Sequence, residues 1–367
     1  MPFDKLLKRA TRGSRSSSPS ESTVSFAASS EELERAEALG VREWVVPRAA
    51  LQLQARIGKG SFGSVHRCNL HGEDQEQYVA KQISPLRTKS EDMSCLVNEM
   101  QVWSSVKHPH CVAFRGVVFG RKEHDDYFLI GEFMPGGTVH ERLVRSAAAN
   151  APPPKRTVLN SEMLQIASAM EYLHSLDIIH RDLKSSNVLI GKDGRLVVGD
   201  FGLARYARPD GEMTAETGSY RWMAPEVIRH ERYSHSCDVY SYGMLCYELL
   251  THRVPYNDTT AVSAALRVAR SGIRPDLPPT APHGVCDIIQ CCWQQDPHAR
   301  PSFATVCTLL EARGASLAAQ ATTDHSKHRP PTVRVAAGDL TNCPSPPKRT
   351  GAACATLDLN RVASLTL

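Results

Sequence analysis

A glycine-rich segment early in the apolar part of the chain has the composition of a phosphate-binding loop. It reads GKGSFGSV over residues 58–65 and follows an alternating apolar stretch that begins at Leu51, as expected of a β-strand. Glycine lets the backbone approach phosphate oxygens and direct N–H groups at them. Dinucleotide-binding folds and chance loops share the same spacing. A dinucleotide-binding unit would continue as a helix, whereas Val65 and residues 78–83 have strand composition, so we set that alternative aside.

Lys81 lies in the middle of the apolar stretch 78–83, which we predict to be a strand. An isolated lysine there would be a surface residue with its stem along apolar neighbours. Glu99 favours a different interpretation. It lies in a predicted helix over residues 91–106, four positions before Trp103, and borders the inward face of that helix. A half-buried lysine needs a carboxylate partner, and a Lys81–Glu99 pair could then hold nucleotide phosphates in place.

Three short polar motifs follow in the second half of the chain. They read HRDLKSSN over residues 180–187, GDFG over residues 199–202 and MAPE over residues 223–226. This order and spacing is not expected by chance. Together with the glycine-rich loop and the Lys81–Glu99 pair, the motifs match the signatures of eukaryotic protein kinases, and the chain resembles that family over residues 51–313.

Smaller features narrow the resemblance to one group of kinases. The runs YRWMAP from Tyr220, DVYS from Asp238 and RPSF from Arg300 are similar to those of the tyrosine kinase-like group. Within that group, Raf-like and MAP kinase kinase kinase-like members resemble the chain most.

The resemblance implies an enzyme that uses ATP and Mg²⁺. The glycine-rich loop is similar to the cover over ATP, and Lys81 to the residue that holds the α- and β-phosphates. Asn187 and Asp200 resemble the Mg²⁺ ligands, hard oxygen donors that suit a small cation. The family's nucleotide contacts fall on Ile57, Gly58, Lys59, Gly60, Ser61, Phe62, Gly63, Ser64, Val65, Ala80, Lys81, Gly131, Glu132, Met134 and Leu189.

Asp182 resembles the family residue that orients the substrate hydroxyl and accepts its proton. A carboxylate is a poor base toward an alcohol, so we expect positioning and late proton acceptance, consistent with a loose phosphoryl transition state. The expected catalytic residues are Lys81, Glu99, Asp182 and Lys184.

Protein serine and threonine hydroxyls are the expected acceptors. Lys184 lies two residues after Asp182, as in serine/threonine kinases, and Ser219 resembles the hydroxyl residue that contacts the catalytic aspartate. Dual or tyrosine specificity remains an alternative. So does a catalytically dead scaffold, although none of the key polar residues has been lost, and so does a small-molecule kinase, against which the motif at residues 224–226 argues.

Regulation by phosphorylation follows from the same resemblance. Arg181 beside Asp182 suggests a cationic pocket for a phosphate on the loop between Asp200 and Glu226. We expect an upstream kinase, or the chain itself, to phosphorylate Thr214 or Thr217.

Gly131 departs from the family pattern, because most kinases have a larger residue at the back of the adenine pocket. We expect the missing side chain to open a cavity there that accepts bulky adenine analogues. Other positions match structural parts of the family. An aromatic stack would be formed by Trp103, Phe114, His180 and Phe201. Asp238 would be a helix anchor beneath the catalytic loop, and Glu226 with Arg300 would form an ion pair in the lower lobe.

Two lobes are needed to bring these residues together. Strand patterns dominate before Pro135 and helical patterns after it, which predicts an α+β, bilobal protein-kinase fold. A small antiparallel-sheet N-lobe with one helix would span residues 51–133, and a larger, mainly helical C-lobe residues 137–313. Amphipathic patterns predict C-lobe helices around residues 163–173 and 236–250.

Both ends differ from the middle in composition. We predict a mostly disordered segment over residues 1–50, apart from a short helical pattern that ends at Gly40, and a disordered segment over residues 314–367. Residues 145–157 have the composition of an inserted loop without an assigned role.

Charge and cysteine content limit the remaining possibilities. With 43 basic and 39 acidic groups the net charge is +4, too even for a nucleic-acid binder. No stretch reaches the roughly 18 apolar residues that a membrane span requires. The 11 cysteines lack the paired spacing of a zinc site and suit a reduced protein, so we expect a cytoplasmic location.

Overall fold

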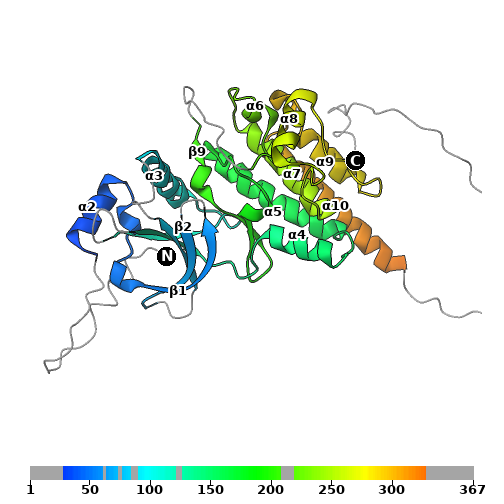
Figure 1. Ribbon diagram of the computed structural model, residues 1–367. Helices are drawn as coiled ribbons and strands as arrows, with labels where there is room; N and C mark the ends of the chain where they lie inside the picture. Colours follow the sequence, from blue (N-terminus) through cyan, green and yellow to red (C-terminus); the bar gives the residue numbers. More distant parts are fainter. Residues whose placement is uncertain are drawn as a thin grey trace, which may run out of the picture. The chain divides into compact units, whose positions relative to one another are not determined.

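The computed structural model describes residues 28–60, 63–72, 77–83, 90–120, 126–207 and 219–327. The chain divides into two compact units, residues 1–322 and 323–367, and all packing described below lies in the first. Within that unit a sheet-rich lobe precedes a helical lobe (Figure 1). The predicted α+β, two-lobed arrangement is confirmed.

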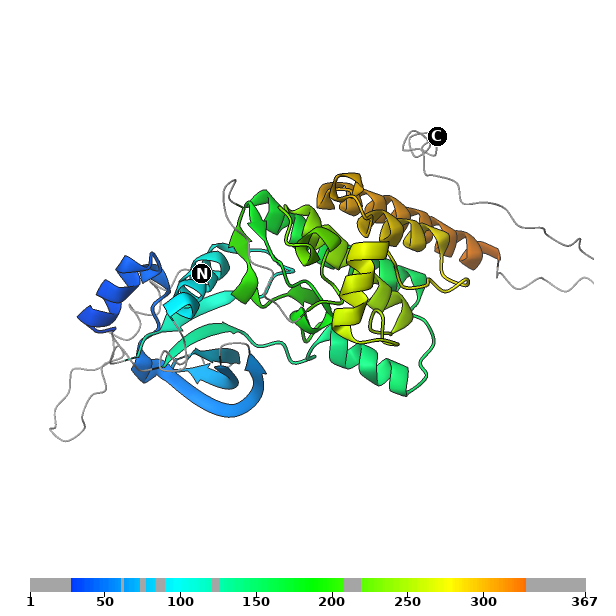
Figure 2. The same ribbon diagram turned by 45° about the horizontal axis from the view of Figure 1, so that its top comes forward.

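A five-stranded antiparallel sheet forms the N-lobe, with the strand order β1-β2-β3-β5-β4. Helix α3 (Ser90–Ser105) contacts β4 and the segment after β8, and lies beside the sheet in both views (Figures 1 and 2). The strands are β1 (Leu51–Gly60), β2 (Gly63–Leu70), β3 (Tyr78–Ile83), β4 (Phe114–Val118) and β5 (Tyr127–Glu132). The predicted strand at 78–83 and the predicted helix at 91–106 are thus confirmed to within a residue.

Strand β1 leaves the core toward its glycine-rich end. Leu51 is buried, but Leu53 and Ile57 are 39% and 46% exposed. Two irregularities in the pairing with β2, on either side of Arg56, accompany this change, as bulges do when a strand bends. The glycine-rich end of the hairpin is therefore supported by strand pairing more than by apolar packing.

Helices make up most of the C-lobe. They are α4 (Val139–Ala148), α5 (Arg156–Ser175), α6 (Pro225–Ile228), α7 (Ser236–Thr251), α8 (Ala261–Ser271), α9 (His283–Cys292) and α10 (Phe303–Lys327). Two small antiparallel pairs carry the loops of the site: β6 (Ile178–Ile179) with β9 (Arg205–Tyr206), and β7 (Val188–Ile190) with β8 (Leu196–Val198). Short 3-10 turns complete the elements: η1 (Arg42–Trp44), η2 (Arg48–Ala50), η4 (Ser185–Asn187), η5 (Phe201–Leu203) and η6 (Pro297–Ala299).

Helices α5 and α7 form the centre of this lobe. Every residue of α7 from Cys237 to Leu250 is buried, which explains why its sequence is apolar on most sides. Helix α5 buries the one apolar face that its sequence predicted, formed by Met163, Ile166, Ala167, Met170 and Leu173. The two helices give the loops at their ends a rigid support.

Residues 28–50, which precede β1, are more ordered than expected. Helix α2 (Ser30–Ala38) is followed by a turn that contains Gly40, whose φ of 70° is the left-handed conformation that favours glycine, so the helical pattern stops there as predicted. The chain then follows β4: the N–H of Val46 donates to the carbonyl of Val117 over 2.8 Å, and the rings of Trp44 and Phe114 lie 5.3 Å apart. Residues 41–46 therefore cover the outer edge of the sheet.

Two other boundaries differ from the prediction. Residues 145–157 are not one inserted loop, because α4 continues to Ala148 and α5 begins at Arg156. A capping box between Thr138 and Glu141 starts α4 and stabilises it. Helix α10 continues to Lys327, beyond the expected end of the domain at residue 313.

Candidate active site

Lys81 joins residues from both lobes. Its Nζ lies 2.6 Å from Oε1 of Glu99 on α3 and 3.3 Å from Oδ1 of Asp200, which follows β8. Glu99 is buried, and Lys81 is nearly so. Three residues that lie far apart in the sequence thus meet in one ion-pair cluster, as the sequence predicted for the lysine and the glutamate.

Charge pairing outweighs burial at Lys81 and Asp200, whereas burial raises the pKa of Glu99. Burial alone would lower the pKa of Lys81, but the carboxylates of Glu99 and Asp200 outweigh it and raise the pKa above the usual range. Burial would likewise raise the pKa of Asp200, yet the neighbouring ammonium holds it below its ordinary value. Asp200 also adopts a φ of 59°, an uncommon conformation for a residue other than glycine. Lys81 and Asp200 thus favour their charged forms, and the aspartate is held in a strained backbone.

A second group of polar side chains surrounds Asp182 in the loop after β6. Its Oδ2 lies 2.7 Å from Nζ of Lys184 and accepts a hydrogen bond of 2.9 Å from Nδ2 of Asn187. Lys184 also donates to Oγ of Ser219 over 2.6 Å. The Ser219 hydroxyl therefore reaches the aspartate through the lysine. The other oxygen, Oδ1 of Asp182, is buried and accepts no hydrogen bond from the residues that the structure describes.

Asp238, at the start of α7, fixes the backbone of this loop. Its oxygens accept hydrogen bonds of 2.8 Å from the N–H groups of both His180 and Arg181, and one lies 3.0 Å from Nε2 of His174. Burial pushes the pKa of Asp238 upward, but these donors outweigh it and hold the pKa below the ordinary value. They also stabilise the left-handed φ of 68° at Arg181. Asp238 is the helix anchor that the sequence predicted.

Glu248 supports the same loop, and we did not predict its role. Its Oε1 accepts a hydrogen bond of 2.7 Å from Oγ of Ser185, and its Oε2 one of 2.7 Å from Nε1 of Trp222. Burial raises the pKa of Glu248 to about 7. The available signal was one glutamate among the mostly apolar residues of α7. Such a residue needs buried donors, although the sequence does not say which.

A row of rings connects the two groups. The ring centroids of Phe114 and Trp103 lie 5.2 Å apart, those of Trp103 and Phe201 6.2 Å, and those of Phe201 and His180 5.8 Å. His180 also contacts the carbonyl of Gly199 through Nε2 at 3.1 Å. The predicted aromatic stack is therefore present, and it includes the tryptophan.

The expected cavity behind Gly131 is absent, which corrects our prediction. A Cβ atom at this position would lie 2.6 Å from Cζ2 and 2.7 Å from Cη2 of Trp103. The indole therefore occupies the space that the glycine leaves. The prediction was wrong because it considered the strand alone, whereas the neighbouring side chain comes from α3.

The remaining predicted nucleotide contacts line the hairpin and the connection between the lobes. Val65 pairs with Lys81 across β2 and β3, and Ala80 is fully buried. Gly63 is sterically required, because a Cβ there would lie 2.0 Å from the carbonyl oxygen of Gln82. Leu189 lies on β7 and bridges to residue 138, next to the connection that contains the buried Met134.

Parts of the predicted loop are outside the described structure. Ser61 and Phe62 lie outside the described residues, as does the side chain of Lys59. Ile57, Gly58 and Ser64 are described on β1 and β2. The side chain of Glu132 forms an ion pair with Arg195, so we expect any nucleotide contact there through the backbone.

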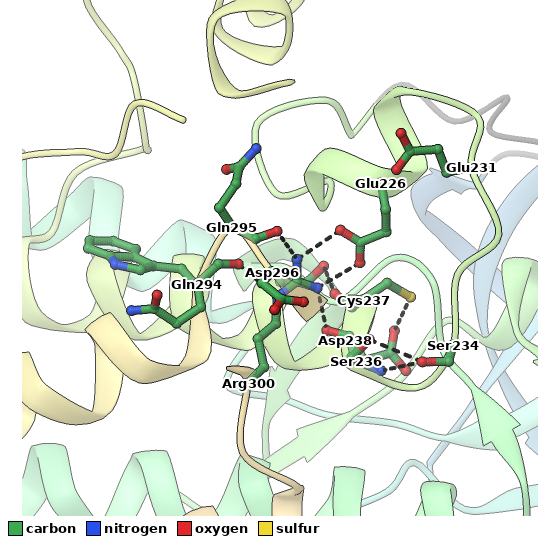
Figure 3. Close-up of polar contacts among 12 residues, drawn as sticks. Glu226, Glu231, Ser234, Ser236, Cys237, Asp238, Gln294, Gln295, Asp296 and Arg300 are labelled. Atoms are coloured by element: carbon green, nitrogen blue, oxygen red, sulfur yellow. Dashed lines mark hydrogen bonds and ion pairs between the residues drawn. The ribbon is translucent and has the colours of Figure 1, made fainter. Parts of the chain in front are cut away.

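The lower-lobe ion pair is formed as predicted. The guanidinium of Arg300 binds both carboxylate oxygens of Glu226, at 2.6 and 2.8 Å. It also donates to the carbonyl of Ser236 over 2.9 Å, which joins the start of α7 to the same cluster (Figure 3). Both side chains are buried. The arrangement connects the segment after Ser219 to the frame of the lobe.

The chemistry of two residues fits Mg²⁺. Asn187 uses its Nδ2 on Asp182, which leaves the amide oxygen available as a ligand. The side chain of Asp200 is 40% exposed, and the N–H of Gly199 donates to the carbonyl of Asn187 over 2.9 Å, so the two segments are adjacent. Among the described residues no group of three or more His, Cys, Asp or Glu side chains could hold a metal alone. Mg²⁺ commonly takes its other ligands from phosphates and water.

The fold and the site together define a two-lobed phosphotransfer domain. Comparison of the sequence with known families gives the same result: residues 51–310 match the family described as protein tyrosine and serine/threonine kinase. The chain belongs to this family. The predicted resemblance to Raf-like and MAP kinase kinase kinase-like members of the tyrosine kinase-like group is also confirmed.

Curated relatives cover the same region. The serine/threonine-protein kinase STY17 of Arabidopsis thaliana is 36% identical over 272 residues, which are 74% of this chain and 46% of that protein. Mitogen-activated protein kinase kinase kinase 10 of Mus musculus is 36% identical over 277 residues, 72% of this chain and 28% of that protein. Mitogen-activated protein kinase kinase kinase 11 of Rattus norvegicus is 37% identical over 273 residues, with shares of 71% and 31%. The chain thus spans less than half of these relatives.

Two further predictions concern the surroundings of the site. In the part of the chain that the structure describes, no helix has the length and apolar character to cross a membrane. The described cysteines are free thiols. Thr214 and Thr217 lie outside the described residues.

Proposed function

We propose that the chain is a serine/threonine protein kinase that transfers the γ-phosphate of Mg-ATP to protein hydroxyls in intracellular signalling. The observation that supports this most is the convergence of Lys81, Glu99 and Asp200 beside the loop that holds Asp182 and Asn187. Family membership and the names of the relatives agree with this activity.

Asp182 is proposed to act on the substrate hydroxyl. Lys184 and Asn187 orient its carboxylate through Oδ2, and this carboxylate is the acceptor for the hydroxyl proton. The hydroxyl oxygen attacks the γ-phosphorus, the bond to the β–γ bridging oxygen breaks, and ADP leaves with that electron pair. The proton passes late to the Asp182 carboxylate, so the aspartate contributes mainly by orienting the attacking oxygen.

The cationic side chains are proposed to neutralise the triphosphate. Lys81 would hold the α- and β-phosphates while Glu99 fixes its direction. Asn187 and Asp200 would hold Mg²⁺, which, when bound, neutralises phosphate charge. Lys184 lies between Asp182 and Ser219, where an ammonium can stabilise the charge of the transferring group close to a short hydroxyl. This position supports serine/threonine specificity.

A phosphate-transfer assay on the full chain tests this proposal. Purified protein is incubated with γ-labelled Mg-ATP and a generic serine- and threonine-containing protein, with a tyrosine polymer in parallel, and the labelled amino acid is identified. We expect label on serine or threonine, and a roughly 1,000-fold lower kcat for Asp182→Asn. Equal transfer by wild type and Asp182→Asn would refute the role of Asp182. Absence of transfer in wild type would refute the assignment of the chain as an enzyme.

We also propose that phosphorylation of Thr214 or Thr217 activates the enzyme and that it acts in the cytoplasm. Arg181 adjoins the catalytic aspartate, and the free thiols suit a reducing compartment. Phosphatase treatment should lower the activity of wild type but not that of the Thr214→Ala/Thr217→Ala double variant. Unchanged activity after treatment of phosphorylated wild type would rule this out.

A further inference from the structure

Strand β5 has no room for a side chain at position 131. Gly131 pairs with Val79 on β3 and with Phe114 on β4, so its backbone is fixed from both sides. The separations of 2.6 and 2.7 Å between a Cβ atom and the Trp103 indole are shorter than real Cβ contacts. The atoms in the way belong to a rigid ring, which cannot yield as the end of a flexible side chain can. Any larger residue at 131 must therefore displace the indole.

The indole is held firmly in this place. Its Nε1 donates a hydrogen bond of 2.7 Å to the carbonyl of Val112. Its ring packs against Phe114 and Phe201, with centroid distances of 5.2 and 6.2 Å. Trp103 is 7% exposed. Displacing the ring would break a buried hydrogen bond and disrupt packing on both sides, so the whole helix would have to move with it.

Helix α3 connects this contact to the ion pair of the site. Trp103 lies four residues after Glu99, which is one helical turn, so both side chains project from the same face. Glu99 contacts Lys81 at 2.6 Å, and Lys81 lies two residues after Val79, the β3 partner of Gly131. The same helix thus touches neighbouring points of the sheet through Trp103 and through Glu99.

We propose that Trp103 and Gly131 form an interlocking pair that closes the inner end of the nucleotide site and docks α3 for the Lys81–Glu99 contact. In this arrangement Trp103, and not a side chain at position 131, determines how deep the adenine site is. Trp103 is a specificity-determining and positioning residue. The proposal rests on the proposed ATP-dependent activity.

The proposal predicts opposite effects for substitutions of Trp103 and of Gly131. Trp103→Leu opens space behind the adenine site, so the variant should accept ATP that carries a bulky group on N6. Gly131→Thr, in contrast, should push out the indole and α3, and so weaken Mg-ATP turnover. Combining the two changes should restore the fit, because the threonine then fills the space that the indole has left.

The test measures kcat/KM for Mg-ATP and for Mg-N6-benzyl-ATP in wild type, both single variants and the double variant. Wild type should discriminate against the analogue. Trp103→Leu should raise the analogue-to-ATP ratio roughly 100-fold, and the double variant should reverse that increase. Gly131→Thr should lower kcat/KM for Mg-ATP roughly 30-fold. The double variant should have a kcat/KM at least roughly 10-fold higher than that of Gly131→Thr. A loss of folding alone would not move the analogue-to-ATP ratio.

Gly116 offers a matched control. A Cβ there would lie 2.4 Å from Cγ2 of Val46, so Gly116→Ala also introduces a clash in the sheet, but away from the indole. Trp103→Leu should not rescue Gly116→Ala. Rescue of both glycine variants would mean that the leucine stabilises the protein in general, and would overturn the pairing.

Other outcomes separate the pairing from the activity. If Gly131→Thr turns over ATP like wild type, or if the double variant shows no recovery, the pairing is wrong while the kinase assignment stands. If wild type does not turn over ATP, the proposed function fails, and the pairing is then judged by melting temperature, where the double variant should exceed Gly131→Thr. Should Trp103→Leu not fold, Trp103→Phe tests the same opening, and rejection of the analogue by this variant refutes the proposal.

Discussion

The two sides of the candidate active site are held in different ways. On the C-lobe side, Asp238 is fully buried, and three donors satisfy its two oxygens. On the N-lobe side, Glu99 is equally buried and contacts Lys81. Its Oε2, however, accepts no hydrogen bond from the described residues. One carboxylate is saturated and the other is not.

This difference separates stability from activity. The loop around Asp182 is fixed by buried polar contacts that do not involve a substrate. The Lys81–Glu99 contact instead depends on the packing of α3 against β5, through Trp103. Changes to the buried polar contacts on the C-lobe side should therefore lower the free energy of unfolding, whereas changes to the Lys81–Glu99 pair should lower turnover with little effect on folding.

The largest effect is expected at the ion pair of Arg300. Arg300→Met leaves the carboxylate of Glu226 buried without its bidentate partner, which should lower the free energy of unfolding by about 3–5 kcal/mol. Urea unfolding measures this loss. Adding Glu226→Gln removes the buried charge and should recover about half of it. If Arg300→Met lowers the free energy of unfolding by less than about 1 kcal/mol, the Glu226–Arg300 pair does not hold the C-lobe together as we expect.

Glu248 should make stability depend on pH. Its pKa is about 7 in the folded protein, against 4.5 for the unperturbed side chain. Folding therefore takes up a proton between these values, and the free energy of unfolding falls as the pH rises through this window, by roughly 3 kcal/mol for this group. Glu248→Gln lacks this titration, so its free energy of unfolding should rise relative to that of wild type by roughly this amount as the pH is raised from about 5 to about 8. The exposed Glu43→Gln serves as control and should track wild type in urea unfolding across this range.

A smaller loss is expected at the anchor of the catalytic loop. Asp238→Asn replaces one acceptor oxygen by a donor that faces buried N–H groups, which should cost about 1–3 kcal/mol. Arg181, no longer held at its φ of 68°, should relax, so kcat should fall by roughly 10-fold or more. Thermal unfolding and the phosphate-transfer assay measure both. The exposed Asp276→Asn should change neither, and a wild-type kcat in Asp238→Asn would contradict the role of the anchor.

The smallest change in stability is expected at Glu99. Glu99→Gln removes an incompletely paired buried charge, and Asp200 still contacts Lys81 at 3.3 Å, so the free energy of unfolding should change by about 1 kcal/mol or less. Turnover should nevertheless fall roughly 10-fold or more. A loss of stability like that of Asp238→Asn would abolish the contrast between the two sides.

Periodic elements and local motifs were predictable from the sequence. Strand β3 and helix α3 follow from alternation and from an apolar face, and Glu99 follows from its place on that face. These signals are local, and short motifs carried the rest of the site through the family resemblance.

The interlock and Glu248 were not predictable in the same way. Whether a cavity lies behind Gly131 depends on where the indole of Trp103 points, which tertiary packing decides. Likewise, a single glutamate in an apolar helix does not reveal that Ser185 and Trp222 supply its hydrogen bonds. The composition of residues 41–46 also did not predict their contacts with β4, because those contacts depend on the tertiary position of the sheet edge.

Those contacts have a practical consequence. Strand β4 is the last in the sheet order, and Val46 occupies its free edge while Trp44 lies against Phe114. A shortened protein that starts at Leu51, where the family match begins, would expose that row of unpaired backbone groups and an aromatic face. Exposed sheet edges pair with the same edge of another molecule, so a protein that starts at Leu51 should self-associate. Loss of activity in such a truncated protein would therefore reveal little about catalysis.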